Sequence, residues 1–157
     1  MTSRRWQRWV ESGALRRHRA TSREVTDLLA VVARDVSDAR AEVISLDRRF
    51  ATAYSAALQL ATVVLAAHGY RAAAQRGHHV VTLRALPEIM GDELTDVADY
   101  LDSCRALRNT SDYDRVGAVG EADVHELLDE VVGLRVRVLE WLASEHPALL
   151  RDATDYS

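Results

Sequence analysis

Residues 45–69 read SLDRRFATAYSAALQLATVVLAAHG, and their large apolar side chains recur every three or four positions. That spacing predicts a helix with one apolar face. Ser45 is suited to cap its first turn, and Asp47 places a negative charge where the helix dipole favours one. Gly69 is a common type of helix end signal. The 24 positions from Ser45 to His68 correspond to about 36 Å at the usual helical rise.

Three further stretches have the same periodicity: residues 21–39, 92–108 and 121–146. The first opens with Thr21 and Glu24 at the spacing of a capping box. None of these apolar faces can be satisfied alone, so they pack on one another or on a second copy of the chain. Only two prolines and seven glycines leave little room for strands and turns. We therefore predict an all-α fold, an up-and-down helical bundle of four to five main helices with an extra N-terminal helix.

The chain divides into an arm, a bundle and a tail. Residues 1–20 are rich in arginine and tryptophan, residues 21–146 hold the bundle, and residues 147–157 form the tail. Trp6 and Trp9 lie among the arginines of the arm, which we expect to be helical. The arm is either an apolar flap over the bundle with a solvated outer face, or a surface on which bases stack.

Composition bounds the class of protein. The 157 residues are 48% apolar and 28% charged, as in one soluble globular domain. The single Cys104 excludes an internal disulfide. No stretch approaches the roughly 20 apolar residues that cross a bilayer, and no secretory signal is evident, so we expect a cytoplasmic protein without membrane contact.

Charge is distributed unevenly along the chain. Residues 1–23 carry +6, residues 51–84 carry +3, and residues 85–157 carry −11. All 20 basic residues are arginine, which indicates the coding bias of a GC-rich genome before any phosphate-binding role. A basic face attracts RNA or the acidic face of another subunit, and composition does not choose between them.

Residues 105–114 read RALRNTSDYD, a polar segment where the helix over residues 92–108 is expected to end. The guanidinium of Arg108 is suited to a phosphate, or serves as a cation at the helix C-terminus. Asn109 either ends the helix in a left-handed conformation or contacts the phosphate. A loop is predicted over residues 109–120. Tyr113, within it, either holds this loop in place or belongs to the site.

Three more residues complete the predicted binding set. Arg105, one turn before Arg108, is a second phosphate contact or pairs with Asp102 or Asp112. His79 follows His78 in a predicted loop over residues 70–79. Adjacent histidines point apart in a helix, so a shared metal is disfavoured. His79 either lies at the start of the next helix or packs against it. Alternatively, it relays protons to the site, if the fold places that loop beside the end of the helix over residues 92–108. We expect no metal and no cofactor, since no glycine-rich phosphate loop or paired-cysteine spacing is present.

The order of these segments resembles a known family. Ala67-His68-Gly69-Tyr70-Arg71 is followed by Gly77-His78-His79, and Ala98-Asp99-Tyr100-Leu101-Asp102 runs into Arg108-Asn109. Over roughly residues 45–142 this resembles the HEPN superfamily (higher eukaryotes and prokaryotes nucleotide-binding). The resemblance implies a helical bundle, often a homodimer. Many members are metal-independent ribonucleases of toxin–antitoxin or other defence systems, and others pair with a minimal nucleotidyltransferase.

The family's active motif is an arginine, often a polar residue, then four to six residues and a histidine. Arg108 and Asn109 match its first half, but Tyr113 stands where histidine is expected, and the next histidine is His125. A tyrosine of ordinary pKa near 10 is a poor base at neutral pH. The resemblance therefore implies either an endoribonuclease with Arg108, Asn109 and Tyr113 as its catalytic set, or a non-catalytic, antitoxin-like partner of a nucleotidyltransferase. A helical interaction module is a third reading.

Overall fold

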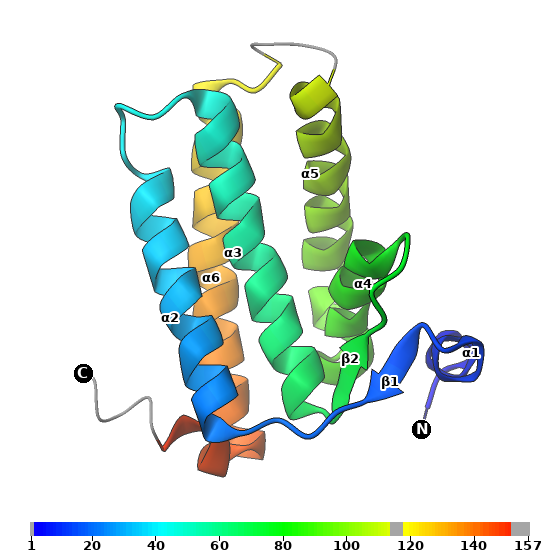
Figure 1. Cartoon of the computed structure of the whole chain (residues 1–157). Helices are drawn as coiled ribbons and strands as arrows, with labels where there is room; N and C mark the ends of the chain where they lie inside the picture. Colours follow the sequence, from blue (N-terminus) through cyan, green and yellow to red (C-terminus); the bar gives the residue numbers. More distant parts are fainter. Residues whose placement is uncertain (1, 114–117, 152–157) are drawn as a thin grey trace.

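The computed structural model describes residues 2–113 and 118–151, with only the backbone of residues 110–113. Four long helices form an up-and-down bundle: α2 (Ser22–Ala39), α3 (Leu46–Ala67), α5 (Thr95–Tyr113) and α6 (Glu121–Glu145). The shorter α1 (Arg4–Ser12) and α4 (His78–Met90) lie to one side (Figure 1). The predicted all-α bundle with an extra N-terminal helix is confirmed.

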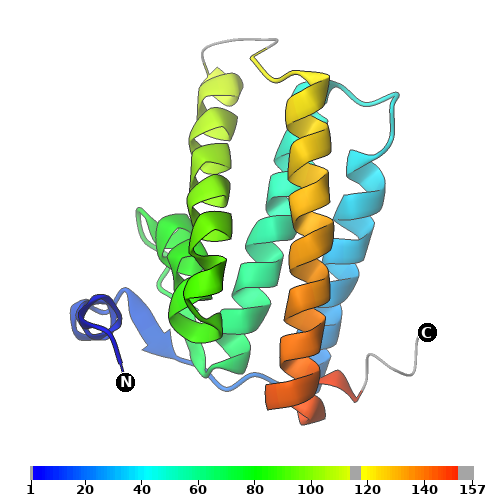
Figure 2. The ribbon, with the colours of Figure 1, turned by 180° about the vertical axis from the view of Figure 1, so that it is seen from behind.

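Helix α3 forms the centre of the core and packs against α2, α4, α5 and α6. Its buried face is rich in alanine, which lets neighbouring helices approach closely. By length and composition α3 could cross a membrane, contrary to the expectation that no stretch could. However, 61% of its most apolar window is buried inside the bundle, as for the core helix of a soluble domain. Figure 2 shows α6 crossing in front of α3 from the other side.

The ends of α2 and α3 lie where their sequence signals predict. The Thr21 side chain accepts a hydrogen bond from the Glu24 backbone N–H at 3.1 Å, which is one half of the predicted capping box. The Glu24 carboxylate instead lies 2.8 Å from Nε2 of His18. Ser45 occupies the N-cap position of α3, although its side chain makes no capping hydrogen bond. Gly69 follows that helix with a φ of 97°, a left-handed conformation that a residue with a Cβ rarely adopts.

A two-stranded antiparallel sheet was not expected from the sequence. Strand β1 (Leu15–Arg17) pairs with β2 (Tyr70–Ala72), in segments predicted as helix and loop respectively. The N-terminal helix ends early, at Ser12, because Gly13 adopts a φ of 80° and its N–H bonds the Val10 carbonyl at 3.2 Å. Strands of three residues are too short to show a periodicity of two.

Helix α1 is held against the body by its aromatic residues. Trp6 is buried and packs with Leu15, Leu65 and Ala85. The Ser3 hydroxyl donates to a carboxylate oxygen of Glu88 on α4 at 2.6 Å and accepts from the Trp6 backbone N–H. The Trp6 ring therefore belongs to the apolar flap, whereas Trp9 is only half-buried.

The ends of α5 differ from the prediction, whereas α6 (Glu121–Glu145) begins and ends where it was predicted. A 3₁₀ turn, η1 (Asp92–Leu94), precedes α5, so the helix starts later than expected. Residues 109–113, predicted as loop, continue α5, because no glycine or proline interrupts the chain there. After α6, η2 (Pro147–Leu150) packs its last two leucines on the core.

Candidate functional site

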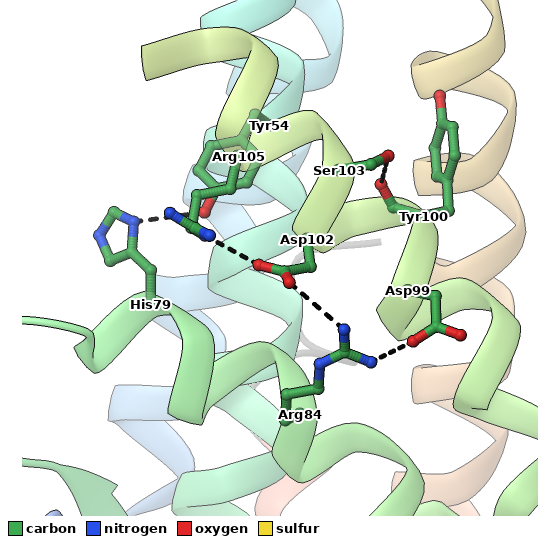
Figure 3. A network of polar contacts seen from close by, with 8 residues as sticks. All are labelled: Tyr54, His79, Arg84, Asp99, Tyr100, Asp102, Ser103 and Arg105. Atoms are coloured by element: carbon green, nitrogen blue, oxygen red, sulfur yellow. Dashed lines mark hydrogen bonds and ion pairs between the residues drawn. The ribbon is translucent and has the colours of Figure 1, made fainter. Parts of the chain in front are cut away.

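Polar side chains from three helices meet along one side of α5 (Figure 3). We call this group the polar site. Tyr54 comes from α3, and His79 and Arg84 come from α4. Gly77 occupies the N-cap position of α4, so His79 lies in its first turn. Helix α5 contributes the others, spaced one turn apart along one side: Asp102, Arg105 and Arg108.

Tyr54 and His79 form the buried end of the site. The Tyr54 side chain is 1% exposed, and its hydroxyl oxygen lies 3.2 Å from Nδ1 of His79, a hydrogen bond whose donor depends on the imidazole tautomer. Burial raises the pKa of Tyr54 to about 12, so the phenol stays protonated and neutral. Burial, and then the nearby charges of His78, Arg108 and Arg105, lower the pKa of His79 below its usual value. His79 is therefore neutral at pH 7 and able to accept a proton.

Two arginines of α5 flank this pair. The Arg108 guanidinium carbon lies 5.6 Å from the centre of the Tyr54 ring, within range of a cation–π contact. Arg105 Nε donates to Asp102 Oδ1 at 2.8 Å. Of the pairings considered for Arg105, the one with Asp102 is thus present. The Arg105 side chain is 28% exposed, so it is accessible to a ligand from solvent.

Asp102 links α5 to α4 through Arg84. Arg84 Nη2 donates to Asp102 Oδ2 at 3.3 Å, and Nη1 donates to Asp99. Burial would raise the pKa of Asp102, but its hydrogen bond to Arg105 and the charges of Arg105 and Arg84 lower it below the usual range. The ionised carboxylate therefore fixes both guanidinium groups.

Sequence reasoning singled out only part of this arrangement. Arg105, Arg108 and His79 come together, although His79 lies far from the arginines in the chain. Tyr54 and Arg84 were missed: Tyr54 falls on the apolar stripe of α3, and no spacing signal links Arg84 to α5. Their contacts depend on how the helices pack.

The other predicted residues stand apart or lie outside the description. Asn109 is exposed and helical, and no described residue other than glycine has a positive φ, so the left-handed cap predicted for Asn109 is wrong. The side chains of Asp112 and Tyr113 lie outside the described residues. Their predicted roles remain predictions. No group of three or more His, Cys, Asp or Glu residues within the described ranges is placed to hold a metal ion.

Comparison with known proteins adds one finding to this geometry. The family model described as SAV_6107-like HEPN matches residues 39–138. That range contains every residue of the polar site and excludes α1, β1 and nearly all of α2. No curated protein and no solved structure matches the chain.

Proposed function

Because the matched residues make up more than half of its length, this chain belongs to the HEPN superfamily, and from that membership we propose that it binds RNA phosphates at the polar site and cleaves RNA without a metal ion. The observation that carries the proposal is the meeting of His79, hydrogen-bonded to Tyr54, with Arg105 and Arg108. A neutral imidazole beside two guanidinium groups suits acid–base chemistry on a phosphodiester.

The arginines provide the phosphate contacts. A guanidinium group presents several N–H donors in a plane and suits the oxygens of a phosphate. Arg105 and Arg108 stand one helical turn apart, so both are placed to reach one phosphate or two neighbouring ones. The hydrogen bond from Arg105 to Asp102 already restricts the Arg105 side chain, so less side-chain entropy is lost when a phosphate binds. In the transition state these cations stabilise the charge that builds up on the pentavalent phosphorane.

His79 supplies the proton transfer that Tyr113 performs poorly. When Nδ1–H donates to the Tyr54 oxygen, Nε2 is free to accept the proton of a ribose 2′-hydroxyl. The 2′-oxygen then forms a bond to phosphorus, and the bond from phosphorus to the 5′-oxygen breaks. The leaving 5′-oxygen takes a proton from water, and the hydroxide left behind takes the proton that Nε2 had accepted. The products are a 2′,3′-cyclic phosphate and a 5′-hydroxyl end.

The family context suggests the wider setting. We propose a cytoplasmic homodimer in which the sites of two subunits face one cleft, acting as the toxin of a toxin–antitoxin or defence system. Sedimentation velocity with the pure protein tests the dimer directly. A monomer at all concentrations would remove this part of the proposal and leave the chemistry of the single site to be tested separately.

A non-catalytic role is the second candidate, because the motif position that normally holds histidine holds Tyr113. The chain would then be a nucleotide-binding or antitoxin-like partner of a minimal nucleotidyltransferase. A nucleotidyltransferase gene next to this one, together with co-purification of the two proteins, would favour this role.

RNA cleavage in EDTA separates the two candidates. Total RNA and tRNA are incubated with the wild type, with Arg108→Ala and with His79→Ala. Arg137→Ala, a change of an exposed arginine on α6, is the matched control. Cyclic-phosphate ends from the wild type and control alone support the nuclease. Equal cleavage by all four proteins would contradict the assignment of the site, and no cleavage by any would favour the non-catalytic partner.

A further inference from the structure

The sheet places two arginines in an unfavourable position. Its register sets Arg16 of β1 directly opposite Arg71 of β2, and both side chains are exposed. Residues opposite each other in an antiparallel pair have Cβ atoms only about 5 Å apart, and like charges there destabilise the sheet. Neither arginine has an ion-pair partner among the residues that the structure describes.

Helix α1 repeats this pattern at its first turn. Arg4 and Arg5 occupy that turn, which contains no acidic residue. The N-terminal end of a helix is the positive end of its dipole, so cations there are unfavourable. Arg8 follows one turn later, and all three side chains are exposed. Among the side chains of residues 2–109 and 118–151, none of the three has an ion-pair partner.

Helix α1 and the β1–β2 sheet are both held in place, so the strands cannot separate to relieve the repulsion between Arg16 and Arg71. Hydrogen bonds continue the ladder beyond both ends of the sheet, from His18 N–H to the Gly69 carbonyl at 2.9 Å and from Ala73 N–H to the Ala14 carbonyl at 2.8 Å. The Arg17 guanidinium carbon lies 5.6 Å from the centre of the Tyr70 ring. Trp6 packs edge-on against the same ring, which joins α1 to the sheet.

We call these exposed arginines of α1, β1 and β2 the basic hairpin surface, where hairpin refers only to the antiparallel β1–β2 pair, since α2 and α3 separate the two strands in the chain. Its members are Arg4, Arg5, Arg8, Arg16, Arg17 and Arg71. The surface borders a hollow of about 550 Å³ lined in part by Arg17, His18, Arg19 and His146. Coding bias accounts for the number of arginines in the chain but not for their placement opposite one another. Locally unfavourable choices of this kind concentrate at functional surfaces, where a ligand offsets them.

We propose that the basic hairpin surface binds the phosphate backbone of RNA, as a second contact beside the polar site. Five of its six arginines lie outside the residues that match the family, and Arg71 lies within them. The short connection along the chain between this surface and the polar site favours RNA over an acidic protein face. From Arg71 the chain runs through exposed Arg76 and His78 to His79. Because its exposed side chains are arginines and Trp6 is buried, we expect the surface to orient RNA mainly by its phosphates.

The inference rests on RNA being the ligand of the proposed function, so the test measures binding apart from cleavage. A labelled 2′-O-methyl RNA lacks the attacking hydroxyl and stays intact. Its affinity is measured by fluorescence anisotropy over a series of salt concentrations for the wild type and for Arg16→Gln/Arg71→Gln. The matched control is Arg48→Gln/Arg137→Gln, which removes the same charge from exposed positions on α3 and α6.

We expect the hairpin variant to bind roughly tenfold more weakly at low salt, with a salt slope shallower by about 1.4, the value for two lost contacts to a single strand. The control keeps the wild-type affinity to within about twofold. Because repulsion is removed, the melting temperature of the hairpin variant stays unchanged or rises by roughly 1–3 °C.

Three results would overturn the inference. Equal loss in the hairpin variant and the control would show a response to net charge alone. A lower melting temperature would show that the arginines stabilise the sheet. A change in oligomer mass without a change in RNA affinity would assign the surface to a second copy of the chain. Cleavage that survives Arg108→Ala would instead refute the proposed function, while the binding result stands on its own.

Discussion

At the polar site Arg84 and Arg105 share the carboxylate of Asp102 (Figure 3), whereas on the basic hairpin surface the pairing of β1 with β2 sets Arg16 opposite Arg71. All four residues are partly or fully exposed arginines of one chain. In the first region, packing supplies a counter-ion and fixes the guanidinium groups before any ligand arrives. In the second, packing forces like charges together. Arginine content alone does not distinguish these regions, but the placement of the partners does.

The largest effect is expected from replacing Arg108 or His79 of the polar site. Replacing Arg108 or His79 by Ala should lower the rate of RNA cleavage in EDTA by about 10²–10⁴-fold, the usual range for losing an acid–base group or a charge-stabilising donor. Far-ultraviolet circular dichroism checks that helicity is unchanged. Gels and cyclic-phosphate end analysis measure the rate.

The result for Arg16→Gln/Arg71→Gln sharpens this prediction. That variant should keep its cleavage rate at saturating RNA, because the hairpin contributes binding and not chemistry. A fall in the saturated rate as large as that of His79→Ala would mean that the two regions form one site.

Removing Asp102 should leave the arginines of the polar site without a counter-ion, as Arg16 and Arg71 are on the basic hairpin surface. In Asp102→Ala the guanidinium groups of Arg84 and Arg105 lose their shared counter-ion and repel each other. We expect a loss of about 1–3 kcal/mol in the free energy of unfolding, as for hydrogen bonds to charged groups. Urea unfolding at neutral pH measures it.

Asp99→Ala is the matched control for that loss. The Asp99 side chain also binds Arg84 but is 58% exposed, so its removal should cost only about 0–1 kcal/mol. Equal losses from the two variants would show that Asp102 has no special part in fixing the arginines.

An element was predictable from the sequence when its apolar periodicity extended over enough residues to be recognised. Periodic apolar residues over four or more turns predicted the helices and their order. The sheet was missed because three-residue strands carry no pattern, and its pairing joins residues 15–17 to 70–72. At the polar site, charged residues at the end of a helix identified Arg105 and Arg108. Tyr54 was hidden because its ring belongs to the core, and only the packing of α4 on α3 brings His79 to its hydroxyl.

Acid should weaken the polar site through His79. Its pKa is lowered in the folded protein, mainly by burial, so the unfolded chain binds more protons just below pH 6.5. The contribution of His79 to stability is therefore complete above about pH 6.5 and is lost as the pH falls through the folded pKa. Urea unfolding at several pH values, compared with His79→Gln, should show a smaller pH dependence in the variant.

The charges of α5 are part of the cause, so Arg108→Ala should move the pKa of His79 upward. Titration followed by NMR of the imidazole carbon protons measures that shift. An unchanged or lower pKa in Arg108→Ala would show that the arginine does not act on His79, and the cluster would lose its electrostatic link.

The smallest expected effect is also the mirror image of the Asp102 change. Arg71→Glu gives Arg16 an opposite charge across the strands, so the hairpin acquires the pairing that the polar site already has. Opposite charges directly across a sheet contribute about 0.2–1 kcal/mol, so the free energy of unfolding should rise by that amount. Affinity for 2′-O-methyl RNA should fall at the same time, by more than in Arg71→Gln, since the new carboxylate repels phosphate. A gain in stability coupled to a loss in binding is expected only where like charges are kept for a ligand. If Arg71→Glu instead weakened both, the arginine would be a structural residue of the sheet, and the contrast between the two regions would disappear.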